Sequence, residues 1–293
     1  MKKDITELFC FVDDFANVYE ETIRHHQITY EQKTKHPTRI PGLKCSEIAT
    51  ILLWFQQSPI RNFKAFYILL LLPHYKNDFP LLPTYDRFVS LMPRTLGLLT
   101  VLLFCLFAKS RGISFIDATP LAVCHNKRIF NHKVFHGLAA RGRTTKGWFF
   151  GFKLHAIIND KAEFVRVRLT KGNVDDRTGV PLMTQELQGL LVGDKGYISQ
   201  KLFLKLYRRG LKLITGIKKN MENCLMTLHE KILLRKRSII ETVFDYLKNK
   251  FQIEHTRHRS PVNAFVHILS TLIAYQIKPT KPSLTQTFYL RNP

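Results

Sequence analysis

Hydrophobic residues along this chain follow two different periods, and the period changes near Ile113. Before that residue the apolar positions recur at helical spacing, as in the stripe of Leu8, Val12 and Phe15, which one face of a helix would bury. After it, short apolar runs and alternating apolar and polar residues follow one another, which is typical of strands. The pattern therefore predicts an all-α N-terminal domain followed by an α/β domain.

Helices of the first part are predicted at residues 4–35 (one or two helices), 46–55, 61–72 and 85–92. Ser58 and Pro59 separate two of these helices, as expected at a helix N-terminus. Thr84 is a polar residue before the segment that carries Arg87, and several short helices of this kind are typical of a helix-turn-helix-like DNA reader. An ordinary helical scaffold is the alternative.

Strands of the second part are predicted at residues 114–123, 149–158, 164–169, 190–192 and 211–217. Helices are predicted there at residues 181–187, 199–209 and 230–251. Asn159 and Asp160 form a good turn pair between the second and third strands, and Ser199 is a typical N-cap for the helix that follows it. The order is three strands, then helix, strand, helix, strand and helix.

Charge points to a polyanionic partner. The chain of 293 residues carries 45 Lys and Arg against 22 Asp and Glu, a net charge of +23. The excess is uneven, because residues 1–110 hold 13 basic and 10 acidic residues (+3) and residues 111–293 hold 32 and 12 (+20). A domain this basic favours binding to nucleic acid.

The sequence favours a cytoplasmic protein over a membrane or secreted one. The most apolar run, Leu96–Phe107, has 12 residues and is too short to span a bilayer. No basic amphipathic helix with lipid-facing aromatic residues stands out, and the N-terminal residues do not form a secretory signal. Five scattered cysteines argue against a zinc site or a disulfide framework. We therefore expect a cytoplasmic protein.

Residues 126–148, between the first two strands, are rich in Lys and Arg and contain no Asp or Glu. Such a segment cannot pack as a core, which favours a loop that binds phosphate and is ordered only on DNA. His132 and His136 have a spacing that could hold zinc, but no further ligand pair lies near them. We interpret Trp148 and the two Phe residues after it as core, with a stacking platform for an unpaired base as the alternative. The candidate DNA contacts here are Lys127, Arg128, Arg141, Arg143 and Lys146.

Two aspartates lie within or directly after predicted buried strands. Asp117 interrupts the apolar pattern of residues 114–123, and Asp194 follows the short strand at 190–192. An ionised carboxylate in such a strand costs several kcal/mol unless a cation or strong hydrogen bonds compensate for it. The carboxyl end of a strand is also where open α/β sheets place their chemistry. Because Mg²⁺ binds carboxylates and retains other oxygen ligands, the two aspartates could share a divalent metal.

A third acid, Glu241, lies on the helix predicted at residues 230–251. At roughly 100° per residue, Arg237 and Lys248 fall in the same stripe as Glu241, along the edge of the apolar face. A solvated face with i, i+4 pairing is the alternative, and Asp245 is a rival for the role of Glu241. Rivals for the second acid lie in the loop after the third strand, where ordinary turn chemistry is the other interpretation; they are Asn173, Asp175 and Asp176.

A resemblance to a known family rests on three motifs, which are Asp117 in IDAT, Asp194 in GDKGY, and the spacing R-x3-E-x6-K of Arg237, Glu241 and Lys248. These motifs resemble those of the DDE transposases of bacterial insertion sequences, and in particular the group called, in words, nine-eight-two. The resemblance covers about residues 110–280 and extends to the N-terminal part. It departs at Leu234, where neighbouring groups carry Tyr.

The resemblance implies a domain organisation. A ribonuclease-H-like catalytic domain with a mixed five-stranded sheet would occupy residues 110–280. An all-α domain at residues 1–109 would precede it, and a tail at residues 281–293 would follow.

The resemblance also implies an activity, which is DNA cleavage at the ends of an insertion sequence followed by strand transfer. Two Mg²⁺ ions, replaceable by Mn²⁺, would be held by Asp117, Asp194 and Glu241, while phosphates would be positioned by Lys195, Arg237 and Lys248. A homodimer would act on double-stranded DNA, both the terminal inverted repeats and the target. A nuclease without strand transfer and a catalytically decayed DNA-binding protein are the alternatives.

Overall fold

The computed structural model describes residues 5–27, 42–145, 147–217, 226–254 and 258–283. Its contacts form two compact units, unit 1 with Met1–Leu106 and Arg259–Ile277, and unit 2 with Phe107–His258 and Lys278–Pro293. We expected residues 110–280 to form one domain, but the helix at 261–276 packs with the N-terminal helices instead. Most of the expected tail lies outside the described residues.

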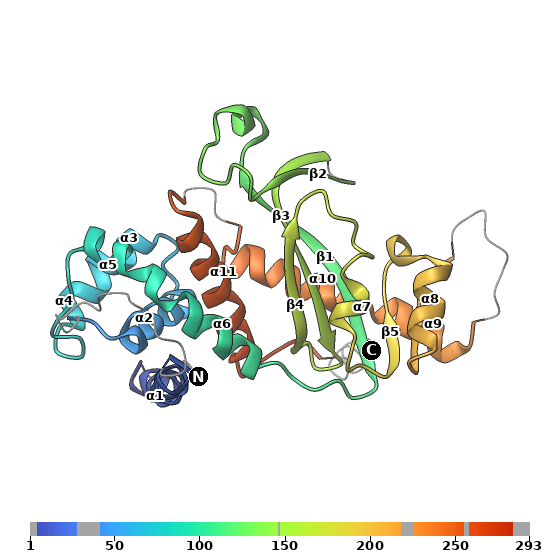
Figure 1. Cartoon of the computed structure of the whole chain (residues 1–293), viewed down its shortest axis with the longest axis horizontal. Coiled ribbons are helices and arrows are strands. Elements are labelled where there is room, and N and C mark those ends of the chain that lie inside the picture. Colours follow the sequence, from blue (N-terminus) through green and yellow to red (C-terminus); the bar gives the residue numbers. More distant parts are fainter. Residues whose placement is uncertain (1–4, 28–41, 146, 218–225, 255–257, 284–293) are drawn as a thin grey trace, which may run out of the picture. The chain divides into compact units, whose positions relative to one another are not determined.

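Unit 1 contains only helices in its described part (Figure 1). They are α1 (Ile5–Gln27), α2 (Cys45–Gln57), α3 (Phe63–Ala65), the π-helix η1 (Phe66–Leu71), α4 (Leu72–His74), α5 (Tyr85–Leu91), the 3-10 helix η2 (Met92–Thr95), α6 (Leu96–Cys105) and α11 (Pro261–Gln276). Aromatic rings form much of the core, where Phe66, Tyr67 and Phe88 are fully buried. The helical character predicted for the N-terminal part is therefore confirmed.

Buried polar contacts hold α11 against α2. Gln56 Nε2 lies 3.2 Å from His267 Nδ1 and 3.3 Å from Ser270 Oγ, and all three side chains are buried. Buried polar groups require partners of this kind. The pairing is long-range in sequence, and no local pattern could have predicted that the last described helix belongs to unit 1.

The helical stretch Tyr85–Cys105 is long and apolar enough to cross a membrane by length and composition alone. The 3-10 turn η2, which contains Pro93, divides this stretch. Leu99 and Leu102 of α6 are buried, and α6 packs against α11. This packing is that of a core helix, as we expected for the apolar run at Leu96–Phe107.

Unit 2 contains a mixed six-stranded sheet (Figure 1). Its strands are β1 (Ile113–Cys124), β2 (Ala140–Thr144), β3 (Gly147–Asn159), β4 (Phe164–Lys171), β5 (Gly189–Val192) and β6 (Leu211–Ile214). β3 pairs antiparallel with β1, β2 and β4, whereas β5 is parallel to β1 and β6. The order β4-β3-β1-β5-β6 is the ribonuclease-H-like arrangement. The predicted fold class is confirmed, and β2 is an addition to the five expected strands.

Helices lie on both faces of this sheet. The helices of unit 2 are α7 (Val180–Met183), η4 (Lys195–Tyr197), α8 (Gln200–Tyr207), α9 (Leu228–Lys236), α10 (Ser238–Asp245) and the π-helix η5 (Tyr246–Lys250). Residues of α7 and α8 share a core with Ile116 of β1. Because side chains alternate along a strand, Asp117 points to the opposite face, against which α10 packs. The single helix predicted at 230–251 is interrupted by a turn at Arg237 and ends in a π-helix.

The basic segment between β1 and β3 has regular structure, which corrects our expectation of a loop ordered only on DNA. Residues 126–131 form the 3-10 helix η3 (Asn126–Asn131), and β2 extends the sheet. Phe135 is only 1% exposed and packs edge-on against Phe152 of β3, with ring centroids 5.7 Å apart. One buried aromatic ring thus supplies an apolar anchor that the overall composition of the segment did not indicate.

Candidate active site

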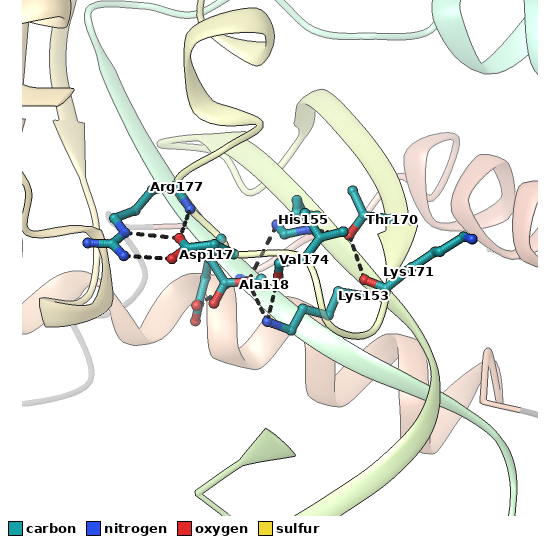
Figure 2. Close-up of polar contacts among 10 residues, drawn as sticks. Asp117, Ala118, Lys153, His155, Thr170, Lys171, Val174 and Arg177 are labelled. Carbon is teal, nitrogen blue, oxygen red and sulfur yellow. Dashed lines mark hydrogen bonds and ion pairs between the residues drawn. The ribbon is translucent and has the colours of Figure 1, made fainter. Parts of the chain in front are cut away.

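Asp117 lies in the middle of β1, the strand between β3 and β5. Its partner across the antiparallel ladder is Ala156, whose small side chain leaves room for a carboxylate. Asp117 Oδ1 accepts a hydrogen bond from the amide of Ala118 at 2.8 Å (Figure 2). Because only 21% of the side chain is exposed, its charge is partly removed from water.

Asp194 comes level with Asp117 through the parallel register of β5 and β1. Val192 pairs with Phe115, and two residues further along both strands lie Asp194 and Asp117, whose side chains therefore project to the same face. Asp194 is exposed and caps η4, with Oδ1 accepting from the amide of Lys195 at 2.7 Å. The register explains how two acids that are distant in sequence come together.

Arg237 joins Glu241 to Asp117. Its Nη2 donates to Glu241 Oε1 at 2.5 Å, and its Nη1 donates to Asp117 Oδ2 at 3.3 Å. Arg237 and Glu241 are one helical turn apart, so both side chains reach the same face. One guanidinium thus bridges two of the three predicted catalytic carboxylates. Asp245, the rival of Glu241, is exposed and accepts a hydrogen bond from Asn249 instead.

The pKa of Asp117 reflects this crowding of negative charge. The pKa of Asp117 is raised from 3.8 to about 6, mainly because burial disfavours the charged form, and also because the charges of Asp194 and Glu241 repel it. The amide of Ala118 and the guanidinium of Arg237 act in the opposite direction. Since Asp194 and Glu241 both affect this pKa, the three acids lie within electrostatic range of one another. Added positive charge would stabilise the ionised form of such a group.

The two lysines predicted to position phosphates lie in different settings. Lys195 is exposed, and its side chain runs along Gly216, where an added Cβ would meet Lys195 Cε at 3.0 Å. Lys248 lies on η5, whose π-helical winding departs from the α-helical stripe that we extrapolated from Glu241. Its Nζ pairs with Glu254 at 3.1 Å, and Glu254 accepts from the amide of Ala122 at 2.7 Å. We had given Glu254 no role.

Asp175, one rival for the second acid, takes part in a turn. It accepts hydrogen bonds from the guanidinium and the amide of Arg177, and these contacts lower the pKa of Asp175 to about 2. Asn173 is exposed in the same loop. This is the turn chemistry that we had favoured for the loop.

Asp176, the other rival in this loop, belongs to a polar cluster on β3. Asp176 accepts from Lys153 Nζ at 3.0 Å and lies 3.9 Å from His155 Nδ1. His155 pairs with Ala118, the neighbour of Asp117, so alternation directs its side chain away from the face of Asp117. Burial lowers the pKa of His155, although the charge of Asp176 raises it.

Tyr197 is a residue beside the acids to which we had given no role. Its side chain is 2% exposed, and its buried hydroxyl has no hydrogen-bond partner among the described residues. Burial raises the pKa of Tyr197, and the charges of Asp117, Asp176 and Asp194 raise it further. The ring packs in the apolar cluster that includes Ile116. The motif GDKGY contains this residue, but no local signal in the sequence indicates that its hydroxyl turns inward.

The remaining predicted DNA contacts are exposed where the structure describes them, and they are Lys127 and Arg128 on η3, Arg141 and Arg143 on β2, and Arg87 on α5 of unit 1. Lys146 lies outside the described residues. Exposed cations of this kind bind phosphate oxygens and position a duplex without reading its sequence.

Asp117, Asp194 and Glu241, called the acid cluster from here on, have the chemistry of a site for a hard divalent cation. Within the described ranges, no three Asp, Glu, His or Cys side chains are arranged as ligands around one point. Asp117 and Glu241 instead share the positive charge of Arg237. Oxygen donors alone suit Mg²⁺, and the raised pKa of Asp117 indicates a demand for positive charge. The donor atoms of these residues therefore have the chemistry that such a cation requires.

The ribonuclease-H-like sheet and its acid cluster define a class of enzymes that act on nucleic acid. Residues 107–261 match the family described as Transposase DDE domain. This match covers more than half of the chain, and the protein belongs to that family of DDE transposases. No curated protein sequence matches the chain.

Among solved structures, one described as "Crystal structure of the Mos1 Strand Transfer Complex" matches with 10% sequence identity and a TM-score of 0.24. The match covers 90% of this chain and 88% of that chain. At that score the likeness adds nothing to the assignment.

Proposed function

We propose that this protein binds the terminal repeats of an insertion sequence of the nine-eight-two group and catalyses metal-dependent DNA cleavage and strand transfer. The proposal is supported by the strand register that places Asp117 and Asp194 on one face of a ribonuclease-H-like sheet, and by Arg237, which pairs with both Asp117 and Glu241. Each acid comes from a different element, and Arg237 bridges two of them. Membership of the DDE transposase family supports the same chemistry.

Asp117, Asp194 and Glu241 would hold two Mg²⁺ ions, for which Mn²⁺ can substitute. When bound, such ions supply positive charge at a scissile phosphate and lower the pKa of an attacking water. DDE transposase domains in general use divalent metals, which supports this part of the proposal.

The chain's own residues would bind and orient the DNA. Arg237, beside Asp117 and Glu241, can grip a phosphate through two parallel hydrogen bonds. Lys195, exposed directly after Asp194, would act as a point charge on a neighbouring phosphate. Water would attack the phosphodiester at the end of the element and release a 3′ hydroxyl, which then attacks the target strand. Neither step requires a nucleophilic side chain of the protein.

The partner would be double-stranded DNA, both the terminal inverted repeats and the target. Residues 111–293 carry +20, the excess of 32 basic over 12 acidic residues, and a basic domain of this kind binds the phosphate backbone. Because two ends of an element have to be joined, we expect a homodimer on the DNA. In a bacterial cell this work takes place on the nucleoid, in the cytoplasm.

The test is an activity assay on DNA that carries the sequences flanking the protein's own gene. We expect the full chain to cleave at the element ends with Mg²⁺ or Mn²⁺, and to join a pre-cut terminal oligonucleotide to target DNA. Asp194→Asn should abolish both reactions and retain DNA binding, because only the charge of one acid is lost. Asp176→Asn is the matched control, since Asp176 pairs with Lys153, and it should remain active.

Three outcomes would contradict parts of the proposal. Wild-type activity in Asp194→Asn, with loss of activity in Asp176→Asn, would exchange the roles of these acids. Cleavage without joining of the pre-cut oligonucleotide would identify a nuclease rather than a transposase. Binding without either reaction would indicate a catalytically decayed DNA-binding protein.

A further inference from the structure

The hairpin formed by β2 and β3 presents two chemically different faces. Gly142 and Phe149 are buried, whereas Arg141, Arg143 and Trp148 are exposed. Arg143 pairs with Trp148 across the antiparallel ladder, and Arg141 is two residues away on the same face. The outer face of the hairpin therefore combines a large aromatic ring with two guanidinium groups.

Cation–π contacts join these three side chains. The guanidinium carbon lies 4.9 Å from the centroid of the Trp148 ring for Arg141 and 5.7 Å for Arg143. Residues 126–148 contain no Asp or Glu, so the segment itself offers these cations no counter-charge. Trp148 is nevertheless 50% exposed. A half-exposed indole is typical of an interaction surface, and the adjacent cations indicate a ligand that is both aromatic and anionic.

Other contacts already hold the hairpin from its inner side. An added Cβ at Gly142 would lie 2.2 Å from the carbonyl oxygen of Gly172, so the two backbones are in close contact. Phe149 is 8% exposed on the same inner face. Asn126 Nδ2 donates to the backbone carbonyl of Trp148 at 2.6 Å and fixes that residue's position. The hairpin is thus preformed, and its outer side chains are available for a ligand.

We propose that this face binds an unpaired nucleotide of the DNA, with its base stacked on Trp148 and adjacent phosphates bound by Arg141 and Arg143. The inference rests on the proposed function and adds that one nucleotide leaves the duplex when the DNA is bound. Stacking suits every base, because each has a π face, and guanidinium groups bind phosphate oxygens in pairs. In an intact duplex the base faces are covered by their neighbours. The indole can therefore stack only on a base that has left the helix.

The strand β3 also sets the distance between this site and the acids. Trp148 lies eight residues before Ala156, which is the ladder partner of Asp117. At about 3.3 Å per residue this separation is at most about 26 Å. At roughly 3.4 Å per nucleotide it corresponds to about eight nucleotides. We therefore expect the unpaired nucleotide within about eight positions of the cleaved phosphate.

Tryptophan fluorescence provides a direct test, because the chain has 2 tryptophans. In a Trp54→Phe variant, Trp148 is the only reporter, and Phe preserves an aromatic ring beside Phe66 and Tyr75. The full chain in EDTA would be titrated with a terminal-repeat duplex and with the same duplex carrying one bulged nucleotide at successive positions. We expect strong quenching of Trp148 when the bulged nucleotide lies at one particular position within about eight nucleotides of the cleaved phosphate. The intact duplex should quench Trp148 only a little.

Substitutions at Trp148 separate stacking from phosphate binding. Trp148→Leu should weaken binding of the best bulged duplex by roughly 5- to 150-fold, the range for loss of one stacked base, without changing the affinity for the intact duplex. Trp148→Phe, which retains a π face, should keep most of the affinity. Circular dichroism would verify that both variants fold, as expected for an exposed side chain.

The failures of the two proposals are distinguishable. Equal quenching by intact and bulged duplexes, or an equal loss of affinity for both in Trp148→Leu, would overturn the inference and leave the hairpin as a phosphate contact. If the wild-type chain binds none of these DNA molecules, the proposed function fails as well. Because EDTA is present, loss of catalysis has no influence on either result.

Discussion

Replacement of Asp117 by Asn is expected to stabilise the protein while it abolishes cleavage. Asp117 is partly buried between β3 and β5, and the charges of Asp194 and Glu241 act on it. Asn has nearly the same shape but carries no charge. The substitution therefore removes the repulsion between Asp117 and the two other acids in the folded protein.

The magnitude follows from the pKa of Asp117. The pKa rises from 3.8 to about 6 on folding, a difference of about two units at roughly 1.4 kcal/mol each. Ionised Asp117 thus destabilises the folded state by at most about 3 kcal/mol. The side chain is 21% exposed, and Asn also loses the ion pair with Arg237. We therefore expect a net gain of about 1–2 kcal/mol in the free energy of unfolding at neutral pH.

The effect of Asp117 on the free energy of unfolding depends on pH. Because the folded-state pKa is above the unfolded value, protonation of Asp117 stabilises the folded protein. That contribution is fully present below about pH 4 and is lost as the pH rises through about pH 6. The variant and the wild type should therefore have equal stability near pH 4 and diverge between about pH 4 and pH 6. Urea unfolding followed by circular dichroism in EDTA would measure the difference at each pH.

Asp245→Asn is the matched control, since Asp245 is an exposed acid on the same helix as Glu241 and accepts from Asn249. Its stability should follow that of the wild type at every pH. If Asp117→Asn is no more stable than the wild type at neutral pH, or if its advantage does not diminish toward pH 4, then Asp117 does not carry the proposed electrostatic strain.

Three further predictions follow from particular contacts. Glu241→Gln should abolish cleavage and leave the affinity for DNA within about twofold in a mobility-shift assay, because phosphate binding depends on cations rather than on this acid. Lys248→Ala breaks the pair with Glu254. Thermal unfolding should show a loss of stability of only about 1 kcal/mol, and the rate of strand transfer should fall by far more than this loss can explain. Neutralising Lys127 and Arg128 should flatten the dependence of log affinity on log salt by about 0.9 for each lost phosphate contact, and an unchanged slope would exclude both from the interface.

The sequence by itself determined the type and order of most elements in unit 2. The periods of apolar residues predicted β1, β3, β4, β5 and β6. A strand that buries one face has alternating apolar and polar residues, and a strand that buries both faces is a short apolar run. Asp117 stood out for the same reason, since a charge in an apolar strand conflicts with its neighbours. Glu241 and Arg237 were connected through helical spacing alone, and the structure joins them by a hydrogen bond.

The helical pattern did not predict where the winding of the chain changes. Residues 246–250 form a π-helix, whose turns contain more residues than those of an α-helix. Lys248 lies within this segment and pairs with Glu254. A hydrophobic periodicity cannot reveal one extra residue in a turn, because the apolar positions before and after it remain compatible with an ordinary helix.

Only the tertiary structure decided which distant segments meet. The parallel register of β5 and β1 brings Asp194 level with Asp117, and the buried ring of Phe135 anchors a segment whose charge favoured a loop. The last described helix joins unit 1 through buried polar contacts with Gln56. Each of these pairings depends on shape and partner choice between residues far apart in the chain. Local periodicity reports which face of an element is buried, but it contains no information about what buries it.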